Sequence, residues 1–246
     1  MPKVAVFNGE PHGASVLSFP GSEQRRVVIV LSGAGTRSRG RYPSLPLPTD
    51  FLHCQVTERL YRAVGGDELI HPPWFGVAPP DWTYSWIRPV LERKLAKYPG
   101  RRFLFVGHSL GGYLGTVFAH GHPELDITTV AIASPFGGAT WMPGSERFFA
   151  VGTEHIRQHR RMLSEQAPPL TLIASEADRL IRPSSALPDL PDSDRILITT
   201  DDASTKSGSE RVIVDRAPGH LALINHPEVL ARISQTEALS PEARAV

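Results

Sequence analysis

Residues 107–111 read Gly-His-Ser-Leu-Gly, so that one serine, Ser109, stands between two glycines. A continuous apolar run, 103–106, precedes this stretch directly, and a helix-like segment, 111–120, follows it. Glycines two residues before and two residues after the serine let a strand and a helix approach closely at a sharp turn, which holds the serine in a strained conformation. Its hydroxyl then lies beside the free N–H groups at the start of the helix. The spacing predicts a nucleophilic serine; the alternative is a glycine-rich turn with an incidental serine.

The elements around this turn follow a regular alternation. Helix-like segments at 51–64, 84–97, 111–120 and 220–233 separate short, continuous apolar runs, which are typical of strands buried on both faces. This order predicts an α/β fold with a mostly parallel sheet. The N-terminal runs 4–7 and 15–19 are expected to form a hairpin and give the sheet an antiparallel edge. The other expected strands are 27–31, 68–71, 103–106, 130–133, 170–174, 196–199 and 212–214.

The chain is expected to form one domain over residues 1–246, because no repeat, low-complexity segment or linker divides it. Residues 139–169 interrupt the alternation, since they are longer than a simple crossover between two strands. We expect a helix over 145–164 and interpret the whole excursion as a candidate cap over one end of the sheet.

Composition excludes several classes of protein. The net charge is +1, with 41% hydrophobic and 21% charged residues, which is ordinary for a globular protein and does not favour nucleic acid as a partner. Cys54 is the only cysteine, which rules out an internal disulfide and a multi-cysteine metal site. The first residues lack the apolar core of a signal peptide, and no stretch approaches the roughly 18 apolar residues of a membrane span. We therefore expect a cytoplasmic protein without a membrane span, and no sequence pattern implies a cofactor.

The sequence around the serine resembles the α/β-hydrolase superfamily. Residues 106–112, VGHSLGG, are close to the nucleophile turn of its lipase and esterase branches. Residues 132–138, IASPFGG, are similar to the segment that follows the next strand in many lipase-like members. The resemblance implies an α/β-hydrolase fold, with a mostly parallel central sheet of about eight strands flanked by helices. It also implies a catalytic triad in the chain order serine, acid, histidine.

His220 is the histidine that fits this order. It follows the strand expected at 212–214 through a short loop and opens the last helix, and the segment APGHLALINHPEVLARI resembles the last segment of the superfamily. His226 lies six residues further on, inside that helix or at a break in it, and is expected to be structural. Within the serine turn, His108 is expected to pack or to form a hydrogen bond.

Asp178 is the expected acid, because it follows the buried strand 170–174 and is itself followed by aliphatic residues and a proline, as is common in the superfamily. A buried carboxylate is needed to hold the imidazole in one tautomer. Glu176 is the first substitute for this role, and Asp201 and Asp202 are less favoured ones.

Two backbone N–H groups are expected to bind the oxyanion of a tetrahedral intermediate. One belongs to Leu110, and by resemblance the second belongs to Ala34, in a loop where many relatives carry His-Gly-x-Gly. Gly35 would leave room beside them. Five aromatic residues are candidate pocket walls, although the first two could instead anchor the next helix: Trp74, Phe75, Trp141, Phe148 and Phe149.

These residues together predict a serine hydrolase that cleaves a small carboxylic ester or thioester through an acyl-enzyme intermediate. Acyl transfer or cyclisation by the same triad is an alternative, since it differs only in the group that accepts the acyl chain. A non-catalytic binding module on the same scaffold is a second alternative. A complete candidate triad argues against that module, and the sequence leaves the oligomeric state open.

Overall fold

The computed structural model describes residues 15–18, 26–31, 68–71, 80–139, 153–200 and 209–236. The helix expected at 51–64 and the strand expected at 4–7 lie outside these ranges.

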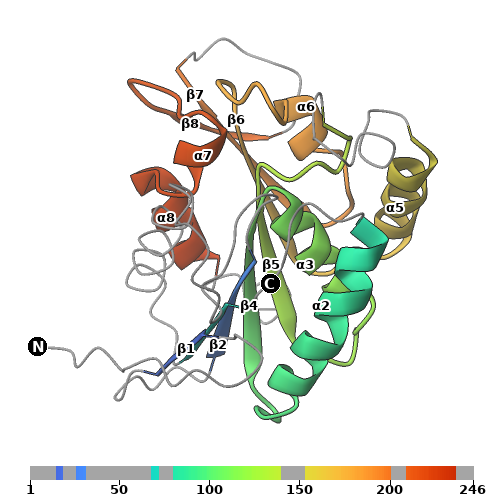
Figure 1. Ribbon diagram of the computed structural model, residues 1–246. Helices are drawn as coiled ribbons and strands as arrows, with labels where there is room; N and C mark the ends of the chain where they lie inside the picture. The colour runs from blue at the N-terminus through green and yellow to red at the C-terminus, as the bar shows by residue number, and fades with distance from the viewer. Residues whose placement is uncertain are drawn as a thin grey trace, which may run out of the picture.

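Within the described residues, eight strands form a single sheet in the order β1-β3-β2-β4-β5-β6-β7-β8 (Figure 1). Neighbouring strands are parallel, except that β1 runs antiparallel to β3 at one edge. The predicted parallel sheet with an antiparallel edge is therefore confirmed, with β3 as the antiparallel partner of β1. The predicted hairpin of 15–19 with 4–7 stays a prediction. The strands are β1 Ser15–Ser18, β2 Arg26–Leu31, β3 Glu68–His71, β4 Arg102–His108, β5 Ile127–Ile132, β6 Leu170–Ser175, β7 Ser193–Thr199 and β8 Glu210–Ile213.

The hydrophobic core has two parts, one on each face of the sheet. Ile29 of β2 and Phe105 of β4 belong to one part, whereas the next residues along each strand, Val30 and Val106, belong to the second part. This alternation explains the continuous apolar runs, because both faces of each central strand are covered. Helices α2 (Pro80–Leu95), α3 (Leu110–His120) and α5 (Glu154–Glu165) pack on the first part, and α7 (His220–Leu223) and α8 (Pro227–Gln235) on the second (Figure 1).

The final helix predicted over 220–233 is wrong as a single element, because it is divided into α7 and α8. Pro227 is the first residue of α8, and His226 before it has an extended backbone, with φ −67° and ψ 134°. A proline has no N–H to continue the preceding helix and disfavours helical backbone at the residue before it. His226 therefore lies at the break.

The helix predicted over 145–164 also begins later than expected. Thr153 has an extended backbone, and its hydroxyl oxygen accepts a hydrogen bond from the N–H of Ile156, which caps α5 at its start. The described helix therefore covers only the second half of the predicted one, and residues 140–152 lie outside the described ranges. A further short helix, α6 (Pro183–Ala186), follows β6.

Candidate active site

Ser109 lies at the corner between β4 and α3, as its neighbouring glycines predict. Its backbone has φ 55° and ψ −127°, a conformation that costs a residue with a side chain on the order of 1–3 kcal/mol. The Ser109 N–H donates a hydrogen bond of 2.8 Å to the carbonyl oxygen of Ile132, which fixes the corner to the neighbouring strand β5. Ser109 directly follows the last residue of β4 and directly precedes the first residue of α3.

Glycine is required on both sides of this corner because the chain crosses itself closely there. A Cβ atom on Gly107 would overlap the Cα of Gly112, and one on Gly112 would lie 2.8 Å from the carbonyl oxygen of Gly107. The Ser134 hydroxyl, from the loop after β5, also contacts Gly112 at a distance that leaves no room for a methyl group. The strand, the helix and the next loop are thus packed at the same point.

His220 and Asp178 meet at the same edge of the sheet. The Nδ1–H of His220 donates a hydrogen bond of 2.7 Å to Oδ2 of Asp178. The Asp178 side chain is fully buried, and its Oδ1 accepts hydrogen bonds of 2.9 Å from the N–H groups of Leu180 and Ile181. Because Nδ1 carries the proton, Nε2 of a neutral His220 has its lone pair free to accept one.

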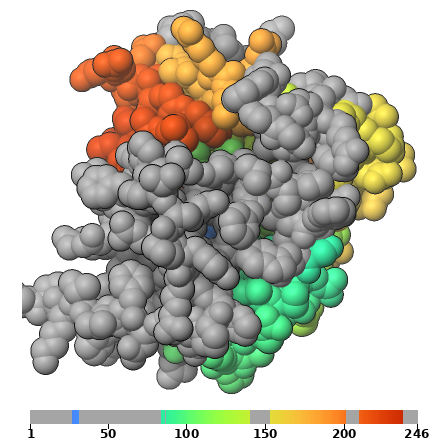
Figure 2. All heavy atoms as spheres, viewed as in Figure 1, coloured from blue at the N-terminus to red at the C-terminus, as the bar shows by residue number. Residues whose placement is uncertain are grey.

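Parallel pairing explains why three residues so distant in sequence share one edge. Ser109 follows β4, Asp178 follows β6, and His220 follows β8, so that each lies beyond the carboxyl end of its strand. The carboxyl ends of parallel strands lie at one edge of a sheet, where ligands of open α/β sheets bind. Figure 2 shows the C-terminal segment with α7 and α8 at the molecular surface.

Glu176, the first substitute considered for Asp178, forms hydrogen bonds elsewhere. Its carboxylate accepts the hydroxyl of Thr199, and it also accepts the N–H and hydroxyl of Thr200, at 2.7 and 2.5 Å. These hydrogen bonds, that from Thr199 first, lower the pKa of Glu176. Glu176 therefore ties the end of β6 to the end of β7, and Asp178 is the carboxylate that contacts His220. The two less favoured carboxylates, at 201 and 202, lie outside the described residues.

The structure shows which contact His108 makes, whereas the sequence left packing and a hydrogen bond as alternatives. His108 is buried, and its Nε2–H donates a hydrogen bond of 2.8 Å to the backbone carbonyl oxygen of His220. The centres of the two imidazole rings are 4.6 Å apart. Burial, followed by the nearby His220, lowers the pKa of His108 to about 3. A sequence gives no sign of this contact, because the acceptor is a backbone atom 112 residues away.

The remaining predicted site residues are only partly described. Leu110 is the first residue of α3 and is fully buried, and the first N–H groups of a helix have no acceptor within the helix. Seven predicted residues lie outside the described ranges: Ala34, Gly35, Trp74, Phe75, Trp141, Phe148 and Phe149.

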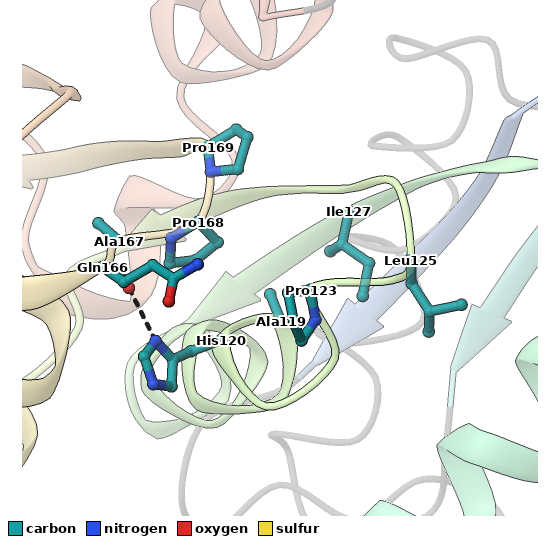
Figure 3. A pocket seen from close by; sticks show the side chains of 9 residues that line it. All are labelled: Ala119, His120, Pro123, Leu125, Ile127, Gln166, Ala167, Pro168 and Pro169. Atoms are coloured by element: carbon teal, nitrogen blue, oxygen red, sulfur yellow. Dashed lines mark hydrogen bonds between the residues drawn. The ribbon is translucent and has the colours of Figure 1, made fainter.

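A cavity of about 180 Å³ lies at the opposite end of the sheet, near the first residues of β5 and β6 (Figure 3). His120 Nδ1–H donates a hydrogen bond of 2.7 Å to the carbonyl oxygen of Gln166 across it. None of the predicted site residues lines it, so it is separate from the edge that carries Ser109. The lining residues are Ala119, His120, Pro123, Leu125, Ile127, Gln166, Ala167, Pro168 and Pro169.

A comparison with models of known protein families identifies the family of the chain. The family model described as "Lipase (class 3)" matches residues 16–145, which is more than half of the chain and includes Ser109 with its flanking glycines. The chain belongs to the class 3 lipase family. The matched region of the chain ends before Asp178 and His220, so the family model does not include them. A search of curated proteins gave no match for the chain.

Several solved structures share the fold of this chain at low sequence identity. A monoacylglycerol lipase from Paleococcus ferrophilus has a TM-score of 0.56 and 14% identity, covering 91% of this chain and 98% of that one. The thioesterase domain from the curacin biosynthetic pathway has the same TM-score and identity, covering 95% and 98%. A serine hydrolase without a lid from Xanthomonas campestris has a TM-score of 0.52 and 17% identity, covering 96% and 92%.

Family and fold together make the chain a lipase- or esterase-like hydrolase of the α/β-hydrolase fold. A small-molecule ester is the substrate class that this relationship implies. None of the helices in the described part of the chain has the length and apolarity that crossing a membrane requires.

Proposed function

We propose that this lipase is a serine esterase that cleaves carboxylic esters or thioesters through an acyl-enzyme intermediate. Ser109 is the nucleophile, His220 the general base and Asp178 the carboxylate that orients it. The observation that carries the proposal is the 2.7 Å hydrogen bond between His220 and the buried Asp178, at the sheet edge where Ser109 has its strained backbone.

The chemistry follows from the protonation state of His220. Its Nε2 takes the proton of the Ser109 hydroxyl as the oxygen attacks the acyl carbon, and the Asp178 carboxylate stabilises the imidazolium that forms. The N–H groups of Leu110 and Ala34 bind the oxyanion of the tetrahedral intermediate. His220 then protonates the leaving alcohol or thiol. In the second half of the reaction it removes a proton from the water that attacks the acyl carbon. It then donates this proton to the Ser109 oxygen as the acyl–oxygen bond breaks, which releases the acid and restores the serine hydroxyl.

Substitution of Ser109 tests the nucleophile. Ser109→Ala should leave the protein folded and lower the hydrolysis of p-nitrophenyl acetate by at least about three orders of magnitude. A fluorophosphonate probe should label the parent protein at one serine and should not label the variant. Ser134→Ala is the matched control, because Ser134 is a neighbouring buried serine outside the proposed triad; it should keep the label and activity within about tenfold. Labelling or normal turnover of Ser109→Ala would refute the mechanism.

We also propose that the aromatic residues of the excursion line an apolar acyl pocket. Each buried methylene contributes about 0.8 kcal/mol, so kcat/KM should rise about fourfold per methylene from acetate esters until the pocket is full. Phe148→Ala and Phe149→Ala should reduce this preference, while the rate on acetate esters stays close to that of the parent. The measurement is kcat/KM across p-nitrophenyl esters from acetate to octanoate, and a flat profile in the parent would contradict the pocket.

A further inference from the structure

We propose that His108 is a positioning residue that holds the main chain of the base, by donating a hydrogen bond from its Nε2–H to the carbonyl oxygen of His220. The inference rests on the proposed function, because it gives His108 a role only in relation to the triad. His108 does not contact the reacting atoms; it acts through His220.

The triad histidine needs a restraint on its backbone as well as on its ring. The Asp178 carboxylate fixes the direction of the His220 ring through Nδ1, at 2.7 Å. A hydrogen bond at one ring atom leaves the position of the main chain free, and Nε2 must reach the Ser109 hydroxyl within about 3 Å. The hydrogen bond of 2.8 Å from His108 acts on the main chain itself, because its acceptor is the carbonyl oxygen of His220.

Within the described part of the chain, the two residues directly beside His220 make little packing contact, although Pro218 is buried. Gly219, the residue before it, has no atom of the described residues within 4 Å of the place where a Cβ would stand, and Leu221, the residue after it, is 61% exposed. Helix α7 is only four residues long and has no side-chain cap at its start. Leu223 is the first residue beyond His220 that is fully buried. The hydrogen bond from His108 therefore restrains the main chain of His220 at a point where its two described neighbours are little packed.

His108 is well placed for this role because it is covalently adjacent to the nucleophile. The same turn that fixes Ser109 through its N–H and Ile132 also fixes the neighbouring imidazole. His220 is thus connected to Ser109 through one residue, His108, and one hydrogen bond. The Asp178 contact, by comparison, depends on a different strand, β6.

The imidazole must also be in one defined form. A carbonyl oxygen only accepts hydrogen bonds, so Nε2 of His108 carries a proton. Burial lowers the pKa of His108 to about 3, with His220 adding to this effect and Asp178 opposing it. His108 therefore stays neutral at the pH values where an esterase is assayed, and it does not place a positive charge 4.6 Å from the imidazolium that forms on His220.

Two substitutions distinguish a His108 that acts as a hydrogen-bond donor from a His108 that only packs as an aromatic ring. His108→Phe keeps a ring of similar size without a donor, whereas His108→Gln carries an N–H at the same number of bonds from the Cβ atom. Loss of the donor should lower kcat by about tenfold to a hundredfold, the scale of leaving a buried carbonyl without its partner, with KM within about threefold. His108→Gln should recover kcat to within about fivefold of the parent.

Nitrogen-15 NMR of histidine-labelled parent protein gives a readout that does not depend on activity or on the folding of a variant. The His108 signals should show the Nε2–H tautomer and should not titrate between about pH 5 and pH 9. The Nδ1–H tautomer, an ordinary titration, or a His108→Phe variant with the kcat of the parent would overturn the inference. Each of these results leaves the proposed function intact if Ser109→Ala is inactive. An active Ser109→Ala would instead refute the proposed function itself.

Discussion

At the scale of single residues, two carboxylates that are two positions apart in the sequence have different surroundings because their hydrogen-bond donors differ. Asp178 is buried and receives two backbone N–H groups on one oxygen and the ring of His220 on the second. Glu176 is exposed and receives the donors of Thr199 and Thr200. Only the first arrangement holds an imidazole in one tautomer inside the protein.

Replacing each carboxylate by its amide tests whether Asp178, and not Glu176, orients His220. Asp178→Asn keeps the shape of the side chain and removes its charge, so kcat for p-nitrophenyl esters should fall by about 10³- to 10⁴-fold, the scale of such a change in a triad. Glu176→Gln is the matched control, since it makes the same chemical change two residues away, and it should cost less than about tenfold. Thermal unfolding of both proteins checks that they are folded. A larger loss in Glu176→Gln than in Asp178→Asn would transfer the role of the acid to Glu176.

Much of the candidate triad was predictable because its signals are local in sequence. Ser109 has its glycines within two residues, and Asp178 and His220 each follow a short apolar run. The hydrogen bond from His108 to the main chain of His220 was not predictable, because its acceptor exists at every residue and only the folded chain selects one. The same holds for the contact between Ser134 and Gly112.

At the scale of elements, the corner at Ser109 is a packing unit of β4, α3 and the loop after β5. It depends on the absence of side chains at Gly107 and Gly112, where the backbones touch. Gly115, one turn further along α3, faces Leu31 and Phe105 and lets the helix lie close to the sheet. The helix therefore presents its N-terminal N–H groups at the level of the strand ends.

Substitutions of two glycines, Gly112 within α3 and Gly121 at its C-terminal cap, test this packing. In Gly112→Ala the new methyl group would lie 2.8 Å from the carbonyl oxygen of Gly107, a backbone atom, so the free energy of unfolding should fall by about 1–3 kcal/mol and activity should fall with it. Gly121→Ala is the control: its φ is −74° and the nearest atom would be 3.5 Å away, so stability should stay equal or rise by about 0.4–1 kcal/mol. Urea unfolding followed by circular dichroism measures both. Equal stabilities of the two variants would contradict close packing at the corner.

Element boundaries were harder to predict than element types. The sequence contains the signals that correct both helices: Pro227, which is the first residue of α8, and the capping Thr153 before α5. A proline or a threonine is also compatible with different local structures, so these residues become decisive only when the flanking backbone is known. The mostly parallel character of the sheet, by contrast, followed from the alternation of apolar runs and helices.

At the scale of the whole molecule, the site is assembled by the sheet. The three candidate residues follow alternate strands of the order β4-β5-β6-β7-β8, and helices cover both faces of that sheet. Helix α8 comes directly after the segment that carries His220, and its buried residues Val229 and Ile233 close the second face. The site should therefore be lost when the sheet and its covering helices unfold together, and not before.

Two isoleucine truncations test this dependence. Ile233 is fully buried under the sheet, so Ile233→Ala should lower the free energy of unfolding by about 2–5 kcal/mol, the sum of lost burial and the cavity left behind. Ile213, on the edge strand β8, is 55% exposed, and Ile213→Ala should cost less than about 1 kcal/mol. Urea titrations measure both effects. Ellipticity and esterase activity should disappear at one midpoint in each protein, and this midpoint should be lower in Ile233→Ala than in Ile213→Ala. Activity that disappears at clearly lower urea than the ellipticity would show that the His220 segment unfolds separately from the sheet. Equal losses of stability in the two variants would show that α8 does not close the core.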